Sequence, residues 1–336
     1  MRSKYSLVVL LVVLVGLAAW WVGANHKFSN SQILNPRGEV EKELPYEKYS
    51  FDNLAKRGGI PSEIEIVGNK FYYYSEGRRI SGEINIPSPE VMVDGSLPVV
   101  VMARGYVEKE GYKTGTGTRN AAAAYAKSGY ITLAPDFSGY GESDPEDENA
   151  LGARLVKPVE ILDLIASLKT LPREDLSRVY LWGHSNGGQI MISVAEILGK
   201  REPSLQGSSS QVGGVTMWAP VTKPFPYNVL YYTDDASDSG KWLRGQISSF
   251  EQDYDVFEYS IDRHISDIKI PLQIHQGSAD DAVPQKWSDD FVKNLRSSEK
   301  DVTYYVYPGA DHNMRPSWDT VVTRDLEFFG KHDQAI

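Results

Sequence analysis

The sequence predicts an α/β fold in which helices cover both faces of a mostly parallel sheet. Short apolar and β-branched runs alternate with helical stretches after residue 97, and this alternation is typical of parallel strands joined by crossover helices. The predicted strands are residues 97–103, 130–135, 179–183, 212–218, 272–276 and 303–307. The predicted helices are residues 119–127, 150–171, 188–198, 285–296 and 318–329.

A hairpin is expected to lead the sheet. Regular structure should begin near residues 63–67, and the runs 71–74 and 79–86 flank Glu76 and Gly77. Two strand-like runs on either side of such a turn indicate an antiparallel pair.

Composition excludes several classes of protein. The chain has 336 residues, a net charge of -10 and a pI near 5.2, whereas nucleic-acid binding needs clustered Lys and Arg, and no such cluster occurs here. Cysteine is absent, so disulfides, thiolate nucleophiles and cysteine metal sites are excluded. The six histidines form no H-E-x-x-H pair, and we predict neither a metal nor another cofactor.

The N-terminus indicates export. Residues 1–24 join a short cationic start to an apolar run from Leu7 to Ala24, and about 18 apolar residues can form a helix that spans a membrane. We expect a single membrane anchor with the rest of the chain outside the cytoplasm. The alternative is a secreted protein whose signal peptide is cleaved before Asn25, after the small residues Gly23 and Ala24.

Two further segments follow the anchor. Residues 25–60 are polar and weakly periodic, which predicts a stem. Residues 61–336 are then the folded domain. Within that domain, residues 223–258 are too long and too aromatic to be a plain connection between two strands.

The segment from Gly183 to Gly187 has the sequence G-H-S-N-G and lies between a predicted strand and a predicted helix. A G-x-S-x-G in this position indicates a nucleophile elbow, a turn so tight that glycine is needed two residues before and two residues after the serine. Such a turn exposes the hydroxyl of Ser185 above the edge of the sheet.

A serine nucleophile needs a base and a third group that orients this base. His312 follows the predicted strand 303–307, and Asp280 follows the predicted strand 272–276. The chain order Ser185, Asp280, His312 is that of the α/β-hydrolase fold. Asp281, the neighbour of Asp280, is the alternative acid.

From about residue 97 onward the chain resembles the catalytic domain of the prolyl oligopeptidase family of α/β-hydrolases. The matching motifs are residues 128–136, 139–143, 183–187, 270–284 and 308–312. The resemblance implies that Ser185 is the nucleophile, His312 the general base and Asp280 the orienting acid. It implies a serine hydrolase. The first expectation is a peptidase that acts on a small peptide substrate. A carboxylesterase of the dienelactone-hydrolase kind is the alternative, and a non-catalytic exported binding protein is a third.

Two backbone N–H groups are expected to form the oxyanion hole. One belongs to Asn186 at the start of the helix, and the other to Tyr106 in the loop after strand 97–103. Members of the family usually have His-Gly where this chain has Arg104-Gly105. Arg104 is therefore a candidate substrate contact, and the alternative is that it packs against the fold and pairs with an acid.

In this fold, insertions at the position of residues 223–258 often cover the nucleophile. We expect a small helical cap that lines the substrate pocket with aromatic side chains. The candidate contacts are Phe225, Tyr227, Tyr231, Tyr232 and Trp242.

Overall fold

The computed structural model describes residues 44–91, 97–171, 176–201, 212–233 and 237–333. Tyr46–Ile336 form one compact unit, to which all the elements below belong. The predicted anchor, residues 7–24, lies outside the described residues. Within the described ranges, no helix combines the length and the apolar character that a membrane span requires.

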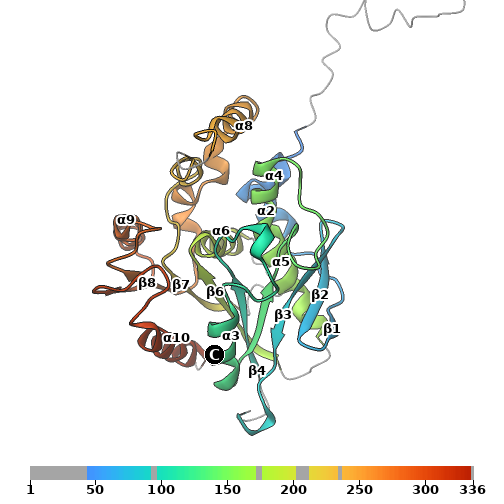
Figure 1. Cartoon of the computed structure of the whole chain (residues 1–336), viewed down its shortest axis with the longest axis vertical. Helices are drawn as coiled ribbons and strands as arrows, with labels where there is room; N and C mark the ends of the chain where they lie inside the picture. Colours follow the sequence, from blue (N-terminus) through green and yellow to red (C-terminus); the bar gives the residue numbers. More distant parts are fainter. Residues whose placement is uncertain (1–43, 92–96, 172–175, 202–211, 234–236, 334–336) are drawn as a thin grey trace, which may run out of the picture. The chain divides into compact units, whose positions relative to one another are not determined.

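A mixed sheet forms the centre of the unit (Figure 1). The described strands form a nine-stranded sheet in the order β1-β2-β3-β5-β4-β6-β7-β8-β9. The first three strands and the β3–β5 pair are antiparallel, and the strands from β5 across to β9 are parallel. Their bounds are β1 Glu65–Val67, β2 Lys70–Ser75, β3 Arg78–Asn85, β4 Leu97–Ala103, β5 Ile131–Pro135, β6 Leu176–His184, β7 Val212–Trp218, β8 Leu272–Gly277 and β9 Val302–Tyr307.

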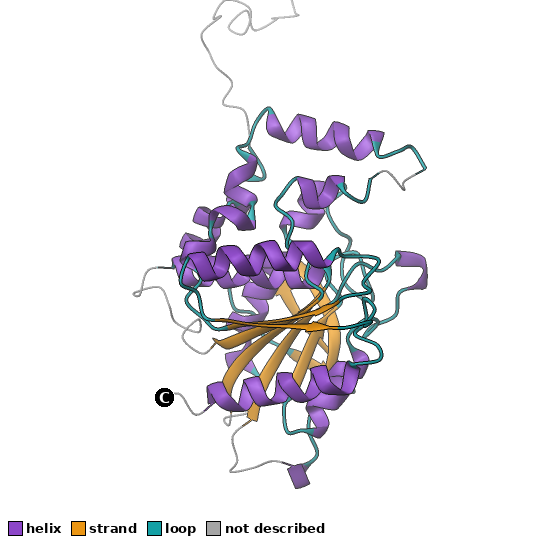
Figure 2. Cartoon of the chain, turned by 90° about the vertical axis from the view of Figure 1, so that its left-hand side faces the viewer, coloured by secondary structure: helices purple, strands orange, loops and turns teal. Residues whose placement is uncertain are grey.

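Helices cover both faces of this sheet (Figure 2), which confirms the predicted fold class. Their bounds are α2 Phe51–Arg57, α3 Arg119–Lys127, α4 Ala150–Leu155, α5 Lys157–Ser167, α6 Asn186–Lys200, α7 Tyr227–Leu230, α8 Lys241–Glu251, α9 Gln285–Ser297 and α10 Trp318–Asp333. Alternate residues of β4 belong to different cores, since Val101 packs with α5 and α6 whereas Met102 packs with α3 and α10. This is the period of two that a strand buried on both faces requires.

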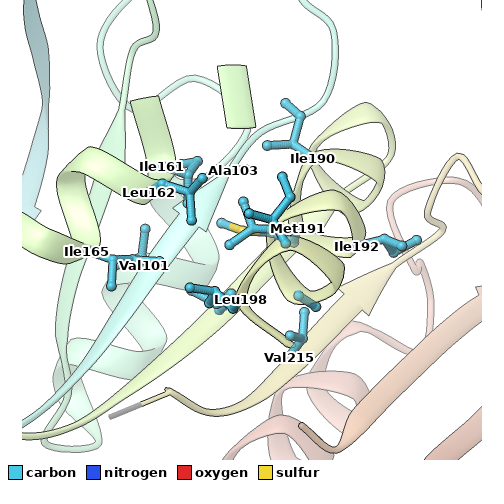
Figure 3. Packing of buried hydrophobic residues seen from close by; sticks show 14 of the residues in the cluster. Val101, Ala103, Ile161, Leu162, Ile165, Ile190, Met191, Ile192, Leu198 and Val215 are labelled. Atoms are coloured by element: carbon cyan, nitrogen blue, oxygen red, sulfur yellow. The ribbon is translucent and has the colours of Figure 1, made fainter. Parts of the chain in front are cut away.

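One core lies between β4, α5 and α6, the helix that begins at the predicted nucleophile elbow. Figure 3 shows Val101 and Ala103 of β4 near Ile161 of α5 and Met191 of α6. All four side chains are fully buried. The helix that begins at the elbow is therefore fixed by a close-packed apolar interior.

The predicted hairpin is confirmed. β2 and β3 pair antiparallel, and Ser75 faces Arg78 across the turn. Glu76 and Gly77 have φ values of 50° and 75°, as a two-residue type I′ turn between twisted strands requires.

The predicted helix 150–171 is instead two helices, α4 and α5, followed by a 3-10 turn at Leu168–Thr170. The break comes at Val156, and Pro158 lies in the first turn of α5. Proline lacks an N–H group and is accommodated only where a helix starts.

The folded unit begins at Tyr46, so the predicted boundary between stem and domain at residue 61 is wrong. Phe51 and Leu54 of α2 are buried in the main core. Arg57 Nη1 and Nη2 bond the two carboxylate oxygens of Asp163 at 2.8 and 2.9 Å. Seven helical residues are too few to show a periodicity in the sequence, and the packing partners of α2 lie far along the chain.

The insertion between β7 and β8 is helical, as predicted. Its described residues form α7, α8 and three 3-10 turns, and Figure 1 shows α8 beyond the helices that cover the sheet. Some of its aromatic side chains pack against one another. Phe250 lies 4.5 Å from Tyr254 and 5.1 Å from Tyr259 between ring centroids, and Tyr46 N donates to the hydroxyl of Tyr254 at 3.1 Å.

The pair between Arg57 and Asp163 provides a test of the revised boundary. Asp163 is buried, and Arg57→Leu leaves its carboxylate without its cation, so we expect the free energy of unfolding to fall by about 3 kcal/mol. Lys48→Met removes an exposed pair with Glu76 from the same segment and should cost less than about 1 kcal/mol. Urea denaturation measures both values. If the two substitutions lowered the free energy of unfolding equally, α2 would lie outside the unit that unfolds cooperatively.

Candidate active site

Ser185 occupies a strained turn between β6 and α6. Its φ of 57° and ψ of -122° are unfavourable for a residue with a side chain, and such strain persists only where the surroundings fix it. Ser185 N donates to Trp218 O at 2.9 Å, and Ser185 O accepts from the N–H groups of Gly188 and Val221, each at 3.0 Å. The end of β7 thus holds the serine backbone in place.

Close backbone approach explains the two glycines of the elbow. A Cβ atom on Gly183 would lie 2.6 Å from Gly187 O, and one on Gly187 would lie 1.9 Å from Ala103 O. A Cβ atom on Gly105 would lie 3.0 Å from the Cβ of Ser185. The loop after β4 therefore passes directly beside the serine.

Asp280 and His312 form a hydrogen-bonded pair. His312 Nδ1 lies 2.9 Å from Asp280 Oδ2, and Asp280 Oδ1 also accepts from the N–H groups of Ala282 and Val283. Burial acts to raise the pKa of Asp280, but these hydrogen bonds, led by that of His312, hold it below its ordinary value. The carboxylate is therefore ionised and fixes the proton of His312 on Nδ1. Asp281 is exposed, so Asp280 is the member of the acidic pair that reaches the imidazole.

A second histidine joins His312 to the elbow. His184 Nε2 donates to His312 O at 2.9 Å, and the two ring centroids are 4.7 Å apart. Burial, followed by the charge of His312, lowers the pKa of His184 to about 4. His184 precedes Ser185 in the chain, so this contact brings His312 next to the elbow at the end of β6. The sequence indicated no role for His184, because the G-x-S-x-G pattern leaves that position open.

The predicted oxyanion donors flank the serine. Asn186 is the first residue of α6, where the N–H groups are free of intrahelical partners and the helix dipole is positive. Tyr106 follows Gly105 in the loop beside Ser185, and its ring is exposed. Arg154 Nη1 donates to Asn186 Oδ1 at 3.0 Å and so ties the start of α6 to the end of α4.

Of the two roles considered for Arg104, the structure shows packing within the fold and not a substrate contact, although the guanidinium bonds backbone oxygens and not an acid. This side chain is 4% exposed, and its guanidinium donates to the backbone oxygens of Gly105 and Asp136 at 2.9 and 3.0 Å. Its Cζ also lies 4.0 Å from the ring centroid of Tyr140 and 4.5 Å from that of Tyr112. Arg104 therefore braces the loop of Gly105 and Tyr106 from within, through two carbonyls and two rings.

Three of the predicted cap aromatics lie near the site. Phe225 is buried and lines a cavity that also contains Asn186. The ring of Tyr231 packs on Trp287 at 4.7 Å. Tyr232 donates from its hydroxyl to Ala282 O at 3.1 Å, and so lies beside the loop that carries Asp280.

The other two cap aromatics are not brought to the elbow. Tyr227 lines a separate surface hollow of about 370 Å³ together with Glu251 and Asp255. Trp242 is exposed in the first turn of α8. Contacts of these two residues with a substrate at Ser185 are therefore not supported, because the insertion folds with these side chains on its outer surfaces.

The sequence pattern of the prolyl oligopeptidase family matches residues 117–334, a span that contains Ser185, Asp280 and His312. The chain belongs to the prolyl oligopeptidase family. A human relative, Protein ABHD12B, is 22% identical over 246 residues, which are 71% of this chain and 62% of the relative. The match thus spans less than two thirds of that relative's length.

Solved structures show the same fold. Est1E from Butyrivibrio proteoclasticus has a TM-score of 0.54 at 17% identity and covers 79% of this chain and 99% of its own. Acetyl xylan esterase 1 from Thermoanaerobacterium has a TM-score of 0.56 at 17% identity, covering 86% and 100%. A puromycin-hydrolyzing peptidase of Mycobacterium tuberculosis has a TM-score of 0.55 at 21% identity, covering 77% and 38%. The chain therefore has the α/β-hydrolase fold.

His184 makes the stability of this site depend on pH. Its folded-state pKa lies below the ordinary value of 6.5, so only the unfolded chain takes up this proton as the pH falls from about 6.5 to about 4. The free energy of unfolding should therefore decrease over this window, by about 3 kcal/mol from this residue.

The variant His184→Gln keeps a donor for His312 O but does not titrate. Urea denaturation at pH 7 and pH 4.5 should give a smaller loss of stability for this variant than for the wild type, because all other groups titrate in both. An identical loss in the two proteins would show that His184 is protonated in the folded state.

Proposed function

We propose that the protein is an exported serine hydrolase that cleaves a small peptide or ester substrate through an acyl-enzyme on Ser185, His312 and Asp280. The observation that carries the proposal is the pair between His312 Nδ1 and Asp280 Oδ2 at 2.9 Å, beside the strained turn of Ser185. Because Asp280 accepts from Nδ1 of His312, Nε2 is the ring nitrogen that can act as the general base.

In the proposed reaction, Ser185 Oγ attacks the substrate carbonyl carbon while His312 Nε2 accepts the hydroxyl proton. Asp280 stabilises the imidazolium that results. The negative oxygen of the tetrahedral intermediate accepts hydrogen bonds from the N–H groups of Asn186 and Tyr106. The intermediate then collapses, His312 gives its proton to the leaving group, and a water molecule hydrolyses the acyl-enzyme by the same steps.

An amine is the first candidate for the leaving group, because the family is one of peptidases. An alcohol is the second, supported by the similarity to Est1E and to acetyl xylan esterase 1, whose chains are covered almost completely. The ratio of kcat/KM for amide and ester substrates with the same acyl group separates the two. Cleavage of unactivated esters without any amide turnover across a broad peptide panel would establish the carboxylesterase.

Substitution of the proposed triad tests the chemistry. Ser185→Ala should abolish both turnover and labelling by a fluorophosphonate probe, since the probe reacts with an activated serine. Asp280→Asn should lower kcat by about 10⁴-fold, because the imidazole loses its orienting carboxylate. Asp281→Asn is the matched control, because that carboxylate is exposed. Full activity of Ser185→Ala would disprove the assignment.

The proposal places the catalytic unit outside the cytoplasm, on the basis of the cationic and apolar residues 1–24. Protease added to intact cells should degrade the catalytic unit, and carbonate washing should leave the protein in the membrane fraction. Recovery of a soluble exported form that starts at Asn25 would establish cleavage of a signal peptide instead. Protection of the catalytic unit in intact cells would disprove export.

A further inference from the structure

A small cavity lies beside the elbow, next to the first turn of α6. It measures about 40 Å³, and its polar wall includes Arg154, Lys157, Asn186 and Asn228. Apolar side chains such as Phe225 form the remainder. The volume exceeds the ~10–15 Å³ that one water requires and suits a polar group of a few atoms.

Among the described residues, no carboxylate lies within ion-pair distance, 4.0 Å, of either cation of this wall, although Glu160 and Glu146 act on Lys157 from further away. Arg154 donates to the neutral amide of Asn186. Lys157 Nζ lies 5.9 Å from the ring centroid of Phe137 and 6.0 Å from that of Tyr140. Arg154 and Lys157 are half-buried, and Lys and Arg residues that are withdrawn from solvent are ordinarily paired with an acid. The cavity thus has an excess of positive charge.

The electrostatic cost of this arrangement is visible in the pKa of Lys157. Burial, followed by the charges of Arg154 and Arg104, lowers this pKa to about 8, against the opposite effects of Glu160 and Glu146. Burial raises the pKa of Glu160 above its ordinary value, and its carboxylate accepts from Ser138 N. A cation beside a cavity whose pKa is perturbed by burial and by neighbouring charges marks a candidate functional site.

Asn228 is a second and independent observation. It is 2% exposed, and neither its Nδ2 nor its Oδ1 has a hydrogen-bond partner among the described residues. A buried amide without partners is costly. Because Asn228 lines the same cavity, its free donor is available to the group that the two cations attract.

We propose that Arg154 and Lys157 bind a carboxylate on the acyl part of the substrate, with Asn228 as a further donor. This inference rests on the proposed function. The acyl side is indicated because the cavity adjoins Asn186, the proposed oxyanion donor, whereas the leaving group departs beside His312, which protonates it. The preferred substrates are then esters or amides of acids that carry a second, negatively charged carboxylate.

Two p-nitrophenyl esters of equal chain length test the proposal, the hemiglutarate with a terminal carboxylate and the pentanoate with a methyl group. The wild type should prefer the hemiglutarate in kcat/KM. Lys157→Met should lower the ratio of the two kcat/KM values by about 10- to 100-fold, since a charge-assisted contact is lost. A loss of activity that affects both esters equally does not change the ratio of their kcat/KM values.

Three further proteins complete the comparison. Arg154→Gln should lower the ratio as Lys157→Met does, and it serves if the latter does not fold. Lys157→Arg keeps the charge and should keep the preference. Lys286→Met removes an exposed lysine that pairs with Asp290 on α9 and should change neither rate.

The pH dependence distinguishes a binding role from a structural one. Between pH 7 and pH 9 the wild-type ratio should fall as Lys157 loses its proton, whereas Lys157→Arg should keep its ratio because arginine stays charged. Equal ratios in the wild type and Lys157→Met, or a wild-type preference for the pentanoate, would overturn the inference and leave the proposed function intact. Absence of turnover of both esters, together with absence of probe labelling at Ser185, would overturn both.

Discussion

The site depends on one constraint, the direct passage of β6 into α6 through Ser185. The backbone there is so crowded that a Cβ atom on Gly187 would meet Ala103 O at 1.9 Å, and the strained φ of Ser185 costs about 1–3 kcal/mol. The apolar face of α6 offsets this cost, since fully buried side chains such as Met191 and Ile192 each contribute about 1.5–3 kcal/mol. The core in Figure 3 therefore holds the serine in a conformation that the serine alone would not adopt.

Charge is distributed unevenly around that turn. On one side, ionised Asp280 stabilises the positive charge that the proposed mechanism places on His312. His184, which packs on the same imidazole, stays neutral at pH 7 because burial lowers its pKa, and so adds no competing charge. On the other side, Arg154 and Lys157 create a positive field beside Asn186. The pair of Asp280 and His312 supports the proposed proton transfer. The positive charges of Arg154 and Lys157 favour a negatively charged group on the substrate.

The sequence predicted the parts of this structure that depend on local pattern. Strands with a period of two, the turn of Glu76 and Gly77, and the spacing of G-x-S-x-G are short-range signals. The proposed acid and base were found because each follows a strand of a recognisable kind. The choice of Asp280 over Asp281 came from the family resemblance, and the geometry agrees with it.

The failures came where long-range packing decides the outcome. Arg104 follows a strand, as a substrate contact would, yet two backbone carbonyls and two rings enclose its guanidinium. The segment 46–60 looks polar, yet Arg57 pairs with Asp163, 106 residues further along the chain. The cavity beside Asn186 is also assembled from distant pieces, with Phe51 from α2 and Phe225 from the insertion. The catalytic residues come from strand ends that the fold keeps constant, whereas the walls of the cavity come from segments that the fold leaves free to vary. The motifs therefore indicate the chemistry, and the packing of these segments sets the substrate.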